Sequence, residues 1–101
     1  MTPAETFEAL YARVTGGDGV TTAAERAAAA GTTSDGVPPA FAKLLDTIRK
    51  AAYRITDADI AALQAAGLSD DAIYELTIAT TAGVAKRRHE SALAAIAEAS
   101  R

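Results

Sequence analysis

The residues best suited to chemistry in this sequence form one run near its end. Lys86, Arg87, Arg88 and His89 are consecutive, and Glu75 precedes Lys86 by roughly 16 Å along a straight helix. Histidine and glutamate can exchange protons with a substrate, so His89 and Glu75 are the candidate catalytic residues. Arginine makes forked contacts with carboxylate or phosphate, so the three cations before His89 are the candidate site for a small anionic ligand. Because Glu75 and Lys86 are this far apart on a straight helix, a site that uses both requires residues from two chains.

Each of these groups also has a plainer structural interpretation. A half-buried histidine packed at an interface explains His89 without any catalysis. The basic run 86–88 is typical of a solvated or ion-paired segment of helix. Both interpretations stay open at the level of sequence.

The composition excludes many kinds of active site. The 101 residues include no cysteine, so disulfides, thiol nucleophiles, iron–sulfur clusters and cysteine zinc sites are excluded. His89 is the only histidine, which excludes a multi-histidine metal centre within one chain. The aspartates at 57, 59, 70 and 71 stand at predicted helix starts, where their charge complements the helix dipole. We therefore predict no metal site and no cofactor.

Charge and hydropathy limit the kinds of partner that the protein can bind. The net charge is −3, whereas a nucleic-acid binder needs a basic surface to displace counterions from phosphate. The stretch 62–73 has the spacing of a helix-turn-helix, but its second helix would bring Asp70, Asp71 and Glu75 to the phosphates. No apolar run approaches the roughly 18 residues that span a bilayer, and the acidic first residues lack the basic start of a signal peptide. We expect a cytoplasmic protein that binds neither nucleic acid nor membrane.

The apolar residues favour assembly. Alanine contributes 27 of them, and alanine forms helices well but buries little surface. A partner subunit would supply the buried area that one such chain lacks. We therefore predict a homo-oligomer.

The helix signals predict an all-α fold with no sheet. Capping patterns start helices at Thr2, Thr22 and Thr56, and the glycine-rich run 16–19 and the glycines at 31 and 67 end them. The first helix should end near residue 14, and the second, an alanine run over 23–30, should have almost no core face. Pro38-Pro39 should start a third, amphipathic helix. Its predicted apolar positions are Phe41, Leu44, Leu45, Ile48 and Tyr53.

The C-terminal half predicts a helical hairpin that ends in a long helix. A helix over 57–66 stops at Gly67, and Ser69 opens a final helix that continues to about Ala99. The whole is a small bundle of about five helices in one domain, 1–101, in which 1–37 supplies two helices and a polar linker.

The final helix has two apolar faces at 100° per residue. One face should pack on its own chain, and it holds Ile73, Leu76, Thr77, Thr80 and Val84. The other face, with a glycine that marks close helix approach or a bend, is the candidate subunit interface. The predicted interface residues are Ile78, Ala82, Gly83, Ala85, Leu93 and Ile96.

The segment 41–96 resembles a known superfamily. The resemblance rests on the acidic helix ending in Ala65-Ala66-Gly67, the Leu68-Ser69-Asp70-Asp71 cap, the Ile73-Tyr74-Glu75-Leu76 helix start, and Gly83 before the basic run. In these features the chain resembles the alkylhydroperoxidase D-like, or carboxymuconolactone decarboxylase, superfamily. The resemblance implies an all-α core over 38–101 that assembles into dimers, trimers or hexamers, with the site near subunit contacts.

The chain departs from the peroxidase branch at its reactive positions. In that branch a Cys-x-x-Cys-x-x-x-His motif carries the chemistry. Aligned on His89, the cysteine positions hold Ala82 and Ala85; aligned on Gly83, they hold Val84 and Arg87. Neither alignment supplies a thiol, so thiol peroxidase activity is excluded.

Three hypotheses for function follow from this departure. The first is a non-redox, non-catalytic member of this superfamily, acting as an oligomeric structural or small-ligand-binding module. The second is a lactone-decarboxylase-like enzyme that uses acid–base and cationic residues at a subunit interface. The third is a regulatory domain that binds another helical protein. The absence of thiols favours the first.

Overall fold

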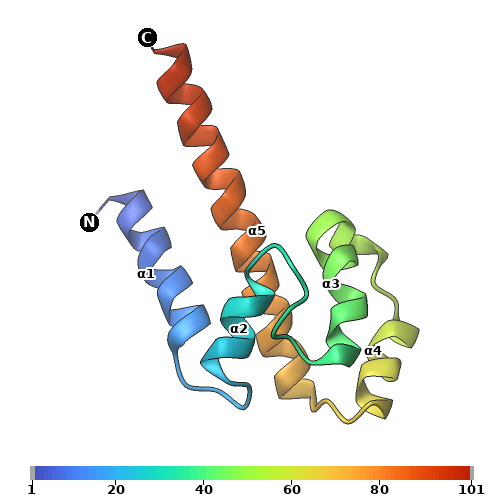
Figure 1. Ribbon diagram of the computed structural model, residues 1–101. Helices are drawn as coiled ribbons and strands as arrows, with labels where there is room; N and C mark the ends of the chain where they lie inside the picture. The colour runs from blue at the N-terminus through green and yellow to red at the C-terminus, as the bar shows by residue number, and fades with distance from the viewer. Residues whose placement is uncertain (1, 101) are drawn as a thin grey trace.

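The computed structural model describes residues 2–100, and the two ends of the predicted domain, Met1 and Arg101, lie outside the described residues. Within that range the chain forms five α-helices, one 3-10 turn and no strand (Figure 1). The elements are α1 (Pro3–Gly16), α2 (Ala23–Ala29), α3 (Pro39–Ala51), η1 (Ala52–Arg54), α4 (Asp57–Ala65) and α5 (Asp70–Ala99). The predicted all-α class is confirmed, including the long final helix.

Local sequence accounts for most helix starts. Thr2, Thr22 and Thr56 each accept a hydrogen bond from the backbone N–H three residues on, and the acidic side chain there accepts one from the cap residue's N–H. Ser69 Oγ accepts from the Ala72 N–H at 3.1 Å to begin α5. Gly67 has a φ of +99°, a conformation that glycine adopts without strain, and so α4 and α5 meet at a tight corner.

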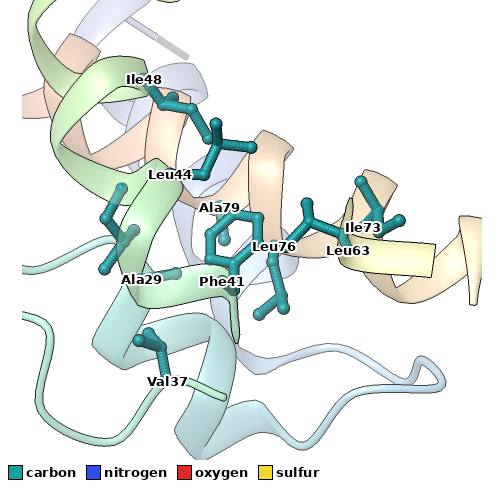
Figure 2. Packing of buried hydrophobic residues seen from close by; sticks show 10 residues of the cluster. Ala29, Val37, Phe41, Leu44, Ile48, Leu63, Ile73, Leu76 and Ala79 are labelled. Carbon is teal, nitrogen blue, oxygen red and sulfur yellow. The ribbon is translucent and has the colours of Figure 1, made fainter. Parts of the chain in front are cut away.

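The core lies between α3 and α5, with contributions from α2 and α4. Figure 2 shows Phe41 of α3 at the middle of this cluster, close to Leu76 and Ala79 of α5. The remaining buried hydrophobic residues of the cluster are Ala29, Val37, Leu44, Leu45, Ile48, Leu63 and Ile73. The amphipathic pattern predicted for residues 41–48, and the inward face predicted for Ile73 and Leu76, are confirmed.

The prediction that the second helix has almost no core face is wrong. Ala29 and Ala30, at the end of α2, are buried, and so is Arg26. The reason is that α2 packs against a glycine. Gly83 of α5 has no side chain, so the backbone at the end of α2 lies directly against the α5 backbone. Alanine is then large enough to fill the remaining space, and α2 becomes a central element.

The placement of Tyr53 on the apolar face of α3 is also wrong. The α-helix ends at Ala51, and Tyr53 lies in η1, where it is 84 % exposed. A 3-10 turn advances fewer residues per turn than an α-helix, so the spacing that puts Ile48 in the core does not extend to Tyr53.

The end of α5 extends beyond the rest of the fold (Figure 1). Residues 90–99 are all exposed, and the described molecule measures 52 × 28 × 21 Å along its principal axes. Helix α1 runs antiparallel to α5 beside the middle of this long helix. No helix among residues 2–100 has the length and hydropathy needed to cross a membrane.

Replacement of Gly83 by alanine should destabilise the protein strongly. A Cβ atom at this position would lie within 2.7 Å of the Ala30 Cα, so two backbones would have to separate. We expect the free energy of unfolding to fall by about 2–3 kcal/mol despite the higher helix propensity of alanine. Thermal unfolding followed by circular dichroism measures this change.

Gly16→Ala is the matched control. An added Cβ there meets no atom within 4 Å. Its stability should stay the same or rise by up to about 1 kcal/mol. Equal stability of Gly83→Ala and Gly16→Ala would contradict the close contact of α2 with α5.

Candidate functional site

The four consecutive residues of the basic run point to different parts of the molecule. Lys86 forms a close ion pair with Glu90, and its Nζ lies 5.4 Å from the centre of the Tyr11 ring on α1. The hydrogen bond between the two charged groups raises the pKa of Lys86 and lowers the pKa of Glu90. Arg88 is exposed and lies on the side of α5 that faces α3 and η1. Lys86 faces α1 and Arg88 faces α3 and η1, so the two cations do not form one binding site.

Arg87 points to the end of α2. Its Nη1 donates to the Ala30 carbonyl at 2.8 Å, and Nη2 of Arg49 on α3 donates to the neighbouring Ala29 carbonyl at 3.2 Å. The final carbonyls of a helix carry partial negative charge, which explains why two arginines meet there. Burial, followed by the nearby charge of Arg87, lowers the pKa of Arg49. Sequence reasoning missed Arg49, because nothing local links it to α2.

His89 packs against the first helix. Its ring is stacked on Phe7 with centroids 5.3 Å apart and an angle of 26° between the planes. Its Nε2 is buried and has no hydrogen-bond partner among the described residues. In this structure the histidine therefore joins α1 to α5 by ring contact.

Glu75 is fully engaged with the loop between α1 and α2. One carboxylate oxygen accepts from the Thr21 N–H at 3.0 Å and from Thr21 Oγ1 at 2.6 Å, and the other accepts from the Val20 N–H at 2.9 Å. These hydrogen bonds favour the ionised form and lower the pKa of Glu75 to about 2. A carboxylate with this pKa stays ionised at neutral pH, which is unfavourable for a general acid.

Arg26 completes this network from α2. It is buried and lies 3.5 Å from the Glu75 carboxylate. Its guanidinium donates to the carbonyls of Val14, Gly17 and Thr21, which closes the loop around it. Sequence reasoning missed Arg26 as well, although a lone cation in an alanine run is the kind of residue that is buried only with partners.

The two candidate catalytic residues are not brought together. Glu75 and His89 are separated by roughly 21 Å along α5. Glu75 contacts the loop 17–21, whereas His89 contacts the N-terminal half of α1. Among residues 2–100, no group of three or more carboxylates and histidine is placed to hold a metal ion.

The predicted interface residues fall into three environments. Ile78, Ala82 and Ala85 line an apolar groove of about 230 Å³ between α5 and α1, whose opposite wall includes Leu10. Gly83 faces α2 instead. Leu93 and Ile96 lie on the projecting end of α5, where they are 48 % and 62 % exposed.

The fold and these contacts define a small all-α protein. In it, the hydrogen bonds and ion pair of Arg26 and Glu75 hold α1 and α2 against the long helix α5. Comparisons with models of known families, with curated proteins and with solved structures gave no match.

Removal of the Glu75 charge should destabilise the protein in a pH-dependent manner. Glu75→Gln leaves Arg26 buried without its countercharge, so we expect a loss of about 2–4 kcal/mol in the free energy of unfolding at neutral pH. The folded-state pKa of Glu75 lies below its ordinary value of 4.5, so the carboxylate stabilises the fold above that pH. This contribution should disappear as the pH falls from about 4.5 to about 2.

Urea unfolding of the wild type and Glu75→Gln across this pH range measures the difference. The control is Glu90→Gln, which removes an exposed ion pair and should change stability by less than about 1 kcal/mol. A constant difference between wild type and Glu75→Gln from neutral to acidic pH would contradict the network.

His89→Phe should stabilise the protein. Phenylalanine keeps the stacked contact with Phe7 and removes the buried Nε2 that lacks a partner. We expect a gain of about 1 kcal/mol, whereas His89→Ala, which loses the ring contact, should be less stable than the wild type. Chemical denaturation of both variants tests this, and a His89→Phe protein less stable than His89→Ala would refute the packing role.

Proposed function

We propose that this protein is a non-catalytic, cytoplasmic module that works as a homo-oligomer, related to the alkylhydroperoxidase D-like superfamily but without its redox chemistry. The observation that carries the proposal is the projecting end of α5. Residues 90–99 are exposed along their whole length, yet they include Leu93 and Ile96. These last turns have little tertiary packing to stabilise them, so contact with a partner helix would stabilise them further.

Exposed apolar residues occur on one face of α5 on both sides of the Phe7–His89 contact, a pattern that suits self-association. Ile78 and Ile96 are separated by about five turns of α5 and share one face. Ile78 lines the groove between α1 and α5, and Leu10 lines the same groove from α1. A second copy related by a two-fold axis would cover the groove and the projecting end of both chains together.

The absence of thiols supports a non-catalytic role, and so does the arrangement of the acid–base candidates. Both carboxylate oxygens of Glu75 accept hydrogen bonds from Val20 and Thr21 of the same chain, and His89 is stacked on Phe7. Among residues 2–100, Glu75 and His89 do not contact each other, so a decarboxylase-like site would need residues from a second chain.

Ile96→Glu should weaken the oligomer. A carboxylate in the apolar contact must be desolvated in each of two subunits, so we expect Kd for dimer formation to rise by about a hundredfold. Sedimentation analysis and native mass spectrometry at micromolar concentrations report the mass of each variant.

Ala94→Glu is the matched control, because it adds the same charge to the opposite side of the same helical segment. This substitution should leave the number of subunits in the oligomer unchanged. A wild-type protein that is monomeric at these concentrations would overturn the proposal and favour a domain that binds a different helical partner.

A further inference from the structure

A second cavity, on the side of α5 that faces α3 and η1, has a lining that suits a charged ligand. It is a cleft of about 360 Å³ between α3, η1 and α5. Three cationic side chains line it, Arg49 and Lys50 from the end of α3 and Arg88 from α5. No carboxylate lines it. Its residues all belong to one chain, so the cleft is complete without a partner subunit.

The cations around this cleft have few counterions. Lys50 forms an exposed ion pair with Asp46 at 3.1 Å, which is weak because both groups are in water. Arg88 makes no hydrogen bond or ion pair with any other described residue. Arg49 is bonded only to backbone carbonyls, and its Nε is buried without a partner. Positive charge therefore exceeds negative charge here, although the whole chain is acidic.

Arg49 also experiences the charge of Arg87 behind it, and this repulsion acts in the same direction as its partial burial. An anion in the cleft would lie near the guanidinium of Arg49, which lines it. It would add to the charge of Asp46, the carboxylate that acts on Arg49 from outside the lining of the cleft.

The rest of the lining is apolar or aromatic. Ile48 and Val84 form apolar parts of the wall, and Tyr53 contributes its exposed ring. Thr81 adds one hydroxyl group. This combination suits a molecule with a charged end and an apolar body better than a fully hydrated inorganic ion.

We propose that the cleft between α3, η1 and α5 binds a small organic carboxylate, with the carboxylate between Arg88 and Lys50 and the apolar body against Ile48, Val84 and the Tyr53 ring. The exposed position of Tyr53, which has no role in the core, is then explained as a wall of the binding site. This inference goes beyond the proposed assembly, since it requires only one chain.

Benzoate is a suitable probe, because it joins one carboxylate to one small apolar ring. A titration followed by amide NMR chemical shifts, at constant ionic strength, should give saturable shifts in residues 48–54 and 81–88. Benzamide has the same shape without the charge and should give much smaller shifts. Inorganic phosphate should bind more weakly than benzoate, because it cannot use the apolar walls.

Arg88→Gln should raise the Kd for benzoate by about tenfold, the effect of losing one charge-assisted hydrogen bond. Arg13→Gln removes the same charge from an exposed residue of α1 outside the cleft and should leave the Kd unchanged. Both variants retain the buried core, and their amide spectra verify this in the same experiment.

Three results would overturn the proposal: no saturable shifts with benzoate, equal binding of benzamide, or equal weakening by both substitutions. Phosphate binding as tight as that of benzoate would replace the organic ligand with an inorganic anion. Since the titration is read on each residue and not on mass, a failure here is distinct from a failure of the protein to form oligomers.

Discussion

The contact between the end of α2 and Gly83 of α5 determines the arrangement of the other elements. With no side chain at Gly83, the two backbones lie together, and the short alanine helix becomes buried. The last carbonyls of α2 then receive Arg49 from α3 and Arg87 from α5. One close approach thereby joins three helices, and it places two like charges near each other because both are attracted to the same helix end.

The Arg26–Glu75 network has a complementary role on the other side of α2. A buried guanidinium is costly unless its donors are satisfied, and here backbone carbonyls at the end of α1 and in the loop 17–21 satisfy most of them. The carboxylate in turn accepts from the same loop. Because Arg26 and Glu75 bind each other and the loop, the connection from α1 to α2 is ordered without a buried hydrophobic residue of its own; its Val20 is exposed.

The sequence allowed prediction of the helices but not of their partners. Caps such as Thr22, Thr56 and Ser69 act within three residues, so local patterns were enough to locate the helix starts. At Gly83 the sequence predicts a close helix approach or a bend, on the candidate subunit interface. The structure has a close approach, but to the end of α2 in the same chain, because an alanine run has no pattern that marks such a contact face. Arg26 and Arg49 bind backbone groups of residues distant in the sequence, and such contacts depend on the fold. The prediction that Tyr53 lies on the apolar face of the third helix was wrong, because the α-helix gives way to a 3-10 turn before this residue.

The single helix α5 contains two segments of very different local stability. Residues 73–83 are held by the core and by α2, whereas residues 90–99 have few contacts apart from their own helical hydrogen bonds. In an isolated chain the distal turns can therefore open without the core, and their amide hydrogens exchange with solvent far sooner than those near Leu76. Slow hydrogen exchange of these distal amides would therefore report that a partner covers the end of α5. Binding of the partner would stabilise these turns in proportion to the fraction of chains that are bound.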